Sequence, residues 1–348
     1  MRYPEFLKPG DTIGFVAPSF GCNISPYRER FDAALNRFKD MGYYVNLGPN
    51  CYEGKGVGIS NTPEACADEL TRYYVNQDSN VLISCGGGEL MCETISLVDF
   101  VQIQNAAPKW FMGYSDNTNF SFLLTTMADT ASVYGPNAAA FGMREWHKSL
   151  YDAIDVLTGR NLKVGNYDKF QIESLVDEEH PYEGFNCTEP THIVGWKPES
   201  GADPADDIFI EGRLLGGCID ILEGLVGTRF DYVKQFNQKY KNDGIIWYLE
   251  ACDLNVLSLR RALWKMNEAG WFENAKGFVF GRPIHPEEIM GLNYVDAVLK
   301  HTLYDHNVPV IIDADIGHVS PAMPIINGAC AKVTLKGQNL VMDMSVGV

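Results

Sequence analysis

PKWFMGYSDNTNF, residues 108–120, predicts a buried strand that leads through a tight turn into a helix. The apolar run from Trp110 to Met112 is typical of a strand end, and Gly113 loosens the backbone. Asp116 or Asn117 can then cap a helix over 119–128. Ser115 is thereby presented on a sharp turn beside the positive end of the helix dipole, as in a nucleophile elbow. Asn117 replaces the second glycine of the G-x-S-x-G pattern, and a plain helix cap is the alternative interpretation of Ser115.

The residues on either side of this stretch alternate between strand and helix patterns across the first 150 residues. Predicted strands cover 12–19, 43–48, 80–85, 110–115 and 131–136, and predicted helices cover 25–42, 63–76 and the region near 89–98. Such alternation indicates an α/β fold with a mainly parallel sheet flanked by helices. Active sites gather at the carboxyl ends of these strands, where Ser19, Gly86 to Gly88 and Ser115 fall.

The character of the sequence changes after about residue 160. Residues 166–207 are polar, acidic and rich in turn formers, whereas short strands and a few helices follow from Ile208 onward. We therefore predict an N-terminal α/β domain over 1–160, a linker over 161–190 and a C-terminal β-rich α+β domain over 191–348.

Composition excludes several classes of function. The chain has 348 residues, 46% of them hydrophobic, and a formal net charge of −17, which disfavours both nucleic acid and anionic membrane surfaces as partners. The opening residues do not resemble a signal peptide, and no apolar run is long enough for a membrane span. The nine cysteines form no C-x-x-C pair, as expected of reduced thiols in a cytoplasmic protein.

A serine nucleophile needs a base and a carboxylate that orients the base. His318 follows the predicted strand VPVIIDADIG (308–317) and lies in the turn GHVSPAMP, whose two prolines favour a rigid loop. Glu250 ends the apolar strand GIIWYLE, where a buried carboxylate requires a partner. The alternatives are a structural loop histidine and a glutamate that faces water.

The glycine run from Cys85 to Glu89 can point backbone N–H groups at an anion. A dinucleotide fingerprint is one interpretation, but Met91 replaces its third glycine and the following helix opens with Glu89. An oxyanion hole beside Ser115 fits the pattern better. A nucleophilic Cys85 is a further alternative, although a cysteine that ends a buried strand is more often part of the core.

Several motifs together resemble the LD-carboxypeptidase family, which includes murein LD-carboxypeptidases and microcin C self-immunity peptidases. They are PGDTIGFVAPS (9–19), GYSDNTNF (113–120), GRLLGGCIDILEGLVGT (212–228), IIWYLEA (245–251) and DIGHVSPAMPIINGA (315–329). The resemblance implies a Ser115–Glu250–His318 triad split across a domain cleft. It also implies an oxyanion hole from the backbone N–H groups of Gly87 or Gly88 and of Asp116, and a homodimer.

Departures from the family pattern bear on the substrate. Cys85 precedes the glycines where murein-type members tend to have Arg-Gly-Gly, and the stretches 60–70 and 134–142 look closer to the microcin-immunity branch. Cys218 replaces the usual asparagine after the paired glycines, and Ala251 follows the triad glutamate. In the immunity branch an aromatic ring stacks on a nucleotide base. Trp196, in GWKPES, is the candidate for that role, with simple loop packing as the alternative.

These observations predict a serine carboxypeptidase-type hydrolase that needs neither metal nor cofactor. The expected substrate is a small peptide or a peptidyl- or aminoacyl-nucleotide, and a murein tetrapeptide is the alternative. A non-catalytic protein that binds a nucleotide or phosphate ligand is the rival from a different class. A carboxypeptidase must also recognise a carboxylate, and Arg213 and Arg282 are the candidates for that contact.

Overall fold

The computed structural model describes residues 1–200, 203–205 and 207–347. The chain divides into two compact units. Unit 1 comprises 1–161, 173–186 and 324–326, and unit 2 comprises 162–172, 187–323 and 327–348. The polar segment predicted over 166–207 includes residues 201, 202 and 206, which lie outside the described residues. The predicted domain limits remain a prediction.

Unit 1 is built around a six-stranded sheet with the order β14-β5-β4-β3-β1-β2. Its strands are β1 (Thr12–Val16), β2 (Tyr44–Leu47), β3 (Val81–Ser84), β4 (Trp110–Gly113), β5 (Ser132–Tyr134) and β14 (Ile325–Asn327). The pairs from β2 through β1, β3 and β4 to β5 are all parallel, as predicted. Strands β3 and β4 are buried on both faces, which explains their uninterrupted apolar sequences.

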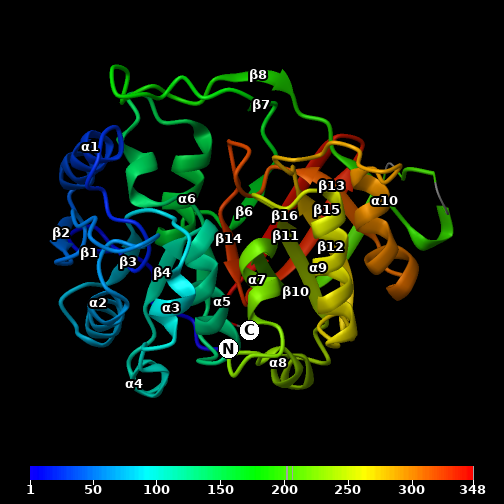
Figure 1. The fold of residues 1–348 in the computed structure, drawn as a ribbon, viewed down its shortest axis with the longest axis horizontal. Helices are drawn as coiled ribbons and strands as arrows, with labels where there is room; N and C mark the ends of the chain where they lie inside the picture. The colour runs from blue at the N-terminus through cyan, green and yellow to red at the C-terminus, as the bar shows by residue number, and fades with distance from the viewer. Residues whose placement is uncertain (201–202, 206, 348) are drawn as a thin grey trace. The chain divides into compact units, whose positions relative to one another are not determined.

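Helices cover both faces of this sheet. They are α1 (Tyr27–Asp40), α2 (Pro63–Val75), α3 (Met91–Ile95), α4 (Phe100–Asn105), α5 (Thr118–Thr126) and α6 (Lys148–Thr158). In Figure 1, α1 and α6 lie on one side of the strands, and α2, α3 and α4 lie on the other. The predicted α/β architecture of this half is confirmed. The sequence pattern did not predict α4 and α6.

Unit 2 contains an eight-stranded sheet with the order β6-β16-β15-β10-β11-β12-β13-β9. Its strands are β6 (Lys163–Gly165), β9 (Val194–Trp196), β10 (Asp207–Cys218), β11 (Ile245–Glu250), β12 (Ala275–Gly281), β13 (Val310–Ala314), β15 (Cys330–Lys336) and β16 (Asn339–Ser345). Strands β10 to β13 run parallel, so their carboxyl ends share one edge of the sheet. A separate hairpin pairs β7 (Lys169–Gln171) with β8 (Cys187–Pro190).

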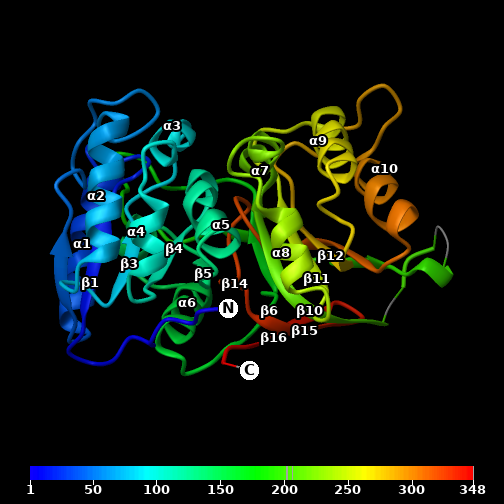
Figure 2. The same cartoon turned by 90° about the horizontal axis from the view of Figure 1, so that it is seen from below.

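The helices of unit 2 connect its parallel strands. They are α7 (Ile219–Leu225), α8 (Val233–Lys239), α9 (Val256–Glu268) and α10 (Tyr294–Leu299), the last continued by a π-helical turn over Lys300–Tyr304. Figure 2 shows α7 and α9 on the same side of the sheet. The predicted β-rich α+β half is confirmed, and α8 is an element that the sequence pattern did not predict.

Candidate active site

Ser115 occupies the sharp turn predicted for it in unit 1. Strand β4 ends at Gly113, and a short 3₁₀ turn over Ser115–Asn117 leads into α5. The φ angle of Ser115 is +65°, in the left-handed region that a residue with a Cβ adopts at a cost of about 1–2 kcal/mol. Such strain gathers at functional sites because the surrounding structure must hold it in place. The half-buried Ser115 therefore has the same position between strand and helix as the nucleophile in a nucleophile elbow.

The two predicted capping residues do not cap α5. Asn117 stands at the N-cap position without a side-chain cap, and its amide instead donates to the Gly86 carbonyl at 2.7 Å. The Asp116 carboxylate accepts hydrogen bonds from the Ser19 hydroxyl at 2.6 Å and from the Met91 N–H at 3.0 Å. The two side chains therefore tie the elbow to the segments that follow β1 and β3 and to the start of α3, a long-range role that helix propensity does not indicate.

Burial dominates the electrostatics of Asp116. Its side chain is almost completely buried, and desolvation raises the pKa of its carboxyl group to about 6. The hydrogen bonds from Ser19 and Met91 oppose this increase because they stabilise the ionised form. The carboxylate is therefore ionised at neutral pH and holds the turn that carries Ser115.

The glycine turn lies directly beside Ser115. A Cβ atom added to Gly87 would stand 3.1 Å from both Cβ and Oγ of Ser115. A Cβ atom on Gly88 would stand 2.2 Å from Oγ of Ser19, so this position has no room for a side chain. The Gly87 carbonyl accepts from the Phe20 N–H at 2.7 Å, which fixes the orientation of the turn. The oxyanion-hole role of Gly87, Gly88 and Asp116 stays a prediction.

Unit 2 brings Glu250 and His318 together. Glu250 is the last residue of β11, and its Oε2 atom lies 2.8 Å from Nδ1 of His318. The Glu250 side chain is fully buried, whereas the His318 side chain is 14% exposed. With Nδ1–H donating to the carboxylate, the Nε2 lone pair is left to accept a proton. The pair has the geometry of a base held by its orienting carboxylate.

The loop that carries His318 is closed by backbone hydrogen bonds. The Met323 N–H donates to the Asp315 carbonyl at 2.8 Å, and the Gln171 N–H donates to the Ser320 carbonyl at 2.8 Å. Gly317 has a φ of +90°, and a Cβ atom there would stand 2.4 Å from Cδ of Glu250. Gly317 therefore helps to position Glu250 beside His318, a role that the sequence analysis did not predict. Its position directly before His318 is the sequence feature that could have indicated this role.

Cys218 is a second residue beside Glu250, and the sequence did not predict this position for it. It ends β10 as Glu250 ends the adjacent parallel strand β11, and the two residues are partners in the strand register. Its Sγ atom donates to Asp220 at 3.4 Å. Burial raises the pKa of the Cys218 thiol well above its usual range, and the nearby Glu250 charge adds to this effect. The sequence feature that could have indicated this proximity is the position of both residues at the ends of their strands.

The structure weakens two of the alternatives. Cys85 is completely buried, and desolvation raises the pKa of its thiol well above the usual value, which disfavours a nucleophilic thiolate. The helix after the glycine turn, α3, has only five residues and an uncapped start at Leu90. A dinucleotide fingerprint requires a full helix whose N-terminus faces the pyrophosphate, so this interpretation loses its support.

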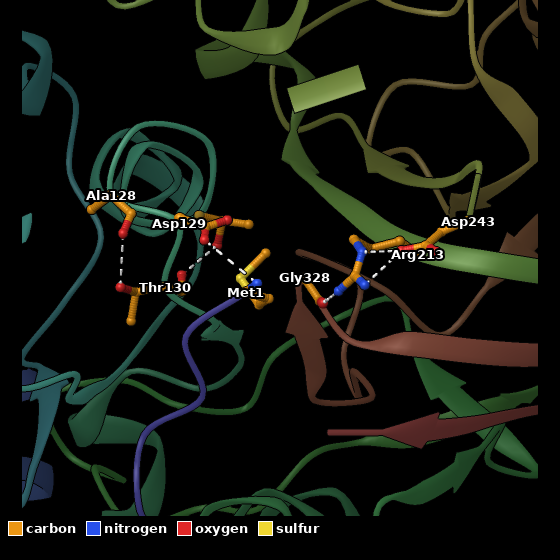
Figure 3. A network of polar contacts seen from close by, with 8 residues as sticks. Met1, Ala128, Asp129, Thr130, Arg213, Asp243 and Gly328 are labelled. Carbon is orange, nitrogen blue, oxygen red and sulfur yellow. Dashed lines mark hydrogen bonds and ion pairs between the residues drawn. The ribbon is translucent and has the colours of Figure 1, made fainter. Parts of the chain in front are cut away.

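The two arginines considered for carboxylate recognition both have partners within unit 2. Arg213 binds Asp243 at 2.6 Å and also donates to the Gly328 carbonyl (Figure 3). Arg282 forms an ion pair with Asp315 and lies over the Phe170 ring, 4.2 Å from its centroid. Both side chains are buried, so each guanidinium group holds the fold together rather than presenting an open fork.

Trp196 lies in a strand and not in the predicted loop. It ends β9, pairs with Val310 of β13 and is 5% exposed. The stacking role of Trp196 stays a prediction, and the burial of its ring weighs against it.

A cavity of about 410 Å³ lies at the amino end of β11, away from Glu250. None of the predicted site residues lines it.

Known proteins resemble this chain over nearly its whole length. The N-terminal domain of LD-carboxypeptidases matches residues 13–135, and the C-terminal domain of LD-carboxypeptidases matches residues 211–333. A relative from Bacillus subtilis (strain 168), described as a probable murein peptide carboxypeptidase, is 23% identical over 99% of this chain and 95% of its own. The chain belongs to the LD-carboxypeptidase family, and it is a carboxypeptidase.

Solved structures show the same fold. An MccF-like protein from Bacillus anthracis superposes with a TM-score of 0.79 at 20% identity, covering 99% of this chain and 100% of its own. The microcin C7 self-immunity protein MccF, in complex with aspartyl sulfamoyl adenosine, superposes with a TM-score of 0.77 at 18% identity, with 98% of each chain covered. In the part of the chain that the structure describes, no helix has the length and apolar character needed to cross a membrane.

Proposed function

We propose that the protein is a serine carboxypeptidase in which Ser115 is the nucleophile, His318 the general base and Glu250 the residue that orients it. The observation that carries this proposal is the 2.8 Å contact between His318 Nδ1 and Glu250 Oε2. A buried carboxylate bonded to Nδ1 stabilises the imidazolium that forms when Nε2 accepts a proton. The positive φ angle of Ser115 supports its part independently.

In the proposed reaction, Ser115 Oγ attacks the scissile carbonyl while His318 Nε2 takes the hydroxyl proton. The backbone N–H groups of Gly87 or Gly88 and of Asp116 stabilise the oxyanion. The C–N bond then breaks, and His318 delivers the proton to the leaving amine. Water attacks the acyl-enzyme with His318 again as the base, which releases the acid and restores the serine.

We propose a peptidyl- or aminoacyl-nucleotide as the substrate. Support comes from the shared fold with the MccF protein whose structure contains aspartyl sulfamoyl adenosine, and from the sequence stretches that resemble the immunity branch. A murein tetrapeptide is the second candidate, favoured by the Bacillus subtilis relative and its description as a probable murein peptide carboxypeptidase.

A direct cleavage assay separates the two candidates. The purified protein is incubated with aspartyl sulfamoyl adenosine in one reaction and with a murein tetrapeptide in another, and products are followed by mass spectrometry. We expect release of sulfamoyl adenosine. Cleavage of the tetrapeptide alone would replace the nucleotide proposal with the murein one.

A fluorophosphonate probe tests the nucleophile separately from the substrate. We expect one label on Ser115 in the native protein and none in Ser115→Ala. Ser96→Ala, which removes an exposed hydroxyl from the same unit, is the matched control and should label normally. A folded protein that takes no label would contradict the serine mechanism and favour a non-catalytic ligand-binding protein.

We also propose a cytoplasmic homodimer. All nine cysteines are free thiols, which supports a reducing location. Cell fractionation tests the location, and sedimentation velocity at micromolar concentration tests the dimer. Recovery with an extracytoplasmic fraction would contradict the first proposal, and a monomeric sedimentation coefficient would contradict the second.

A further inference from the structure

We propose that Cys218, Glu250 and His318 form a binding site for a soft divalent cation, represented by Zn²⁺, and that occupation of this site inhibits the enzyme.

The strand register places the three side chains together. Cys218 and Glu250 are register partners at the ends of the adjacent parallel strands β10 and β11. His318 comes from the loop after β13, and its ring is held against Glu250. One donor atom from each residue, the sulfur, a carboxylate oxygen and a ring nitrogen, lies within 4.8 Å of the other two. Three elements of unit 2 therefore converge on one point.

The donor set matches the coordination chemistry of zinc. Zn²⁺ binds cysteine sulfur at about 2.3 Å and histidine nitrogen or carboxylate oxygen at about 2.0–2.2 Å, usually in tetrahedral geometry. Donor atoms around a tetrahedral ion with these bond lengths stand roughly 3.3–3.8 Å apart. The three donors, which lie within 4.8 Å of one another, must therefore draw closer as the ion binds. Three protein ligands leave the fourth position to water, as in many catalytic zinc sites. Cys218 and Glu250 are almost completely buried, so their ligand atoms are shielded from bulk solvent.

Metal binding removes the base that the proposed reaction requires. If the ion binds His318 through Nε2, it occupies the lone pair that would accept the serine proton. If it binds through Nδ1, the proton of the neutral ring resides on Nε2, which again cannot act as a base. The Cys218 thiol loses one proton to solvent when it becomes a thiolate ligand. The inhibition rests on the proposed function, whereas the binding of the ion rests on the geometry alone.

Cobalt binding tests the site without reference to activity. Co²⁺ replaces Zn²⁺ as the probe, and we expect a thiolate-to-cobalt charge-transfer absorption band at one Co²⁺ per chain that excess Zn²⁺ abolishes. Cys218→Ser and Cys218→Asn should remove the band and weaken Zn²⁺ binding, measured by calorimetry, by more than the ~10–100-fold typical of losing an outer-sphere partner. Circular dichroism confirms that each variant is folded.

Cys252→Ser is the matched control, because Cys252 is a thiol of the same unit outside the three-residue cluster. It should keep the cobalt band. A band that survives in Cys218→Ser would assign the metal to other thiols, such as the buried Cys22, Cys51 and Cys85, and would overturn the proposal. Loss of the band in Cys252→Ser alone, or no Zn²⁺ binding to the wild-type protein at millimolar concentration, would do the same.

The inhibitory part is measured as each variant's rate in Zn²⁺ divided by its own metal-free rate. The wild-type rate should fall in parallel with site occupancy and recover with EDTA, while the rates of Cys218→Ser and Cys218→Asn should be insensitive to the same Zn²⁺ concentration. Cobalt binding without any hydrolytic activity would contradict the proposed function and leave the metal site standing. Hydrolysis that is unaffected at full occupancy would refute the inhibition.

Discussion

Glu250 Oε2 accepts a hydrogen bond from His318 Nδ1 at 2.8 Å, although the two residues are 68 positions apart in the chain. The carboxylate is at the end of a central parallel strand, and the imidazole is carried by a loop that backbone hydrogen bonds close at both ends. The fully buried glutamate gains its partner only because β11 and the loop after β13 meet at the same edge of the sheet.

Replacing Glu250 with glutamine should lower kcat by about 10³–10⁴-fold with little change in KM. The glutamine amide can donate to the ring and reverse the tautomer, so that Nε2 no longer accepts a proton. Steady-state kinetics measure the effect. Glu268→Gln, which alters an exposed glutamate of α9, should leave the rate unchanged. A Glu250→Gln rate close to wild type would show that this carboxylate does not orient the base.

Replacing Gly317 with alanine should lower kcat/KM by more than about 100-fold, as expected when a catalytic group is misplaced by about an ångström. The new Cβ atom would stand 2.4 Å from Cδ of Glu250 and separate the carboxylate from His318. Gly337→Ala is the control, because Gly337 also has a positive φ angle but no atom within 4 Å of an added Cβ.

Backbone strain should cost Gly337→Ala about 1–2 kcal/mol of stability in urea unfolding. Gly317→Ala should lose more, because the overlap with the buried Glu250 side chain adds to the strain. Only Gly317→Ala should lose activity. Equal activity in the two variants would show that the contact between Gly317 and Glu250 has no part in positioning His318.

Replacing Gly87 with alanine should reduce kcat by about 10²-fold, as expected when a reacting group is displaced by about an ångström. The added Cβ atom would lie 3.1 Å from Ser115 Oγ and occupy space beside the nucleophile. Gly184→Ala in the same unit meets its nearest atom at 3.8 Å and should behave as wild type. Single-turnover acylation measures the step directly, and an unaltered acylation rate in Gly87→Ala would show that the close approach of this turn to Ser115 is not needed for attack.

Glu69 should make the protein less stable as the pH rises from 4.5 to 7. Its buried carboxylate accepts the Ala17 and Asn50 N–H groups, each at 2.8 Å, and desolvation raises its pKa from 4.5 to about 7. In this window the folded state holds a proton that the unfolded chain releases, so the free energy of unfolding falls as pH increases. The full loss is about 3 kcal/mol.

Urea midpoints across this pH range test the assignment to Glu69. Glu69→Gln imitates the protonated acid and should flatten the dependence, whereas Glu64→Gln, at an exposed position of the same helix, should preserve it. A slope that is equally steep in Glu69→Gln would assign the titration to another buried acid, such as Asp116.

Local sequence patterns were sufficient to predict the parallel strands of unit 1, most of its helices and the turn at Ser115, but not α4 and α6. These features depend on neighbouring residues, because apolar periodicity selects strand or helix and Gly113 loosens the chain between them. Several motifs spread along the whole chain were also sufficient to identify the family. The matches to both LD-carboxypeptidase domains confirm this identification. Helix α8 escaped prediction because its sequence, VKQFNQK, offers few apolar positions.

The sequence by itself thus determined most of the helices and strands, the family and the residue types of the proposed chemistry. Only the tertiary structure decided which partner each polar group took. It paired Arg213 with Asp243, moved Trp196 from a loop into an edge strand, and set Cys218 beside Glu250. These outcomes depend on strand order and register, which are set by contacts between residues far apart in the chain and leave no periodic trace within any one segment.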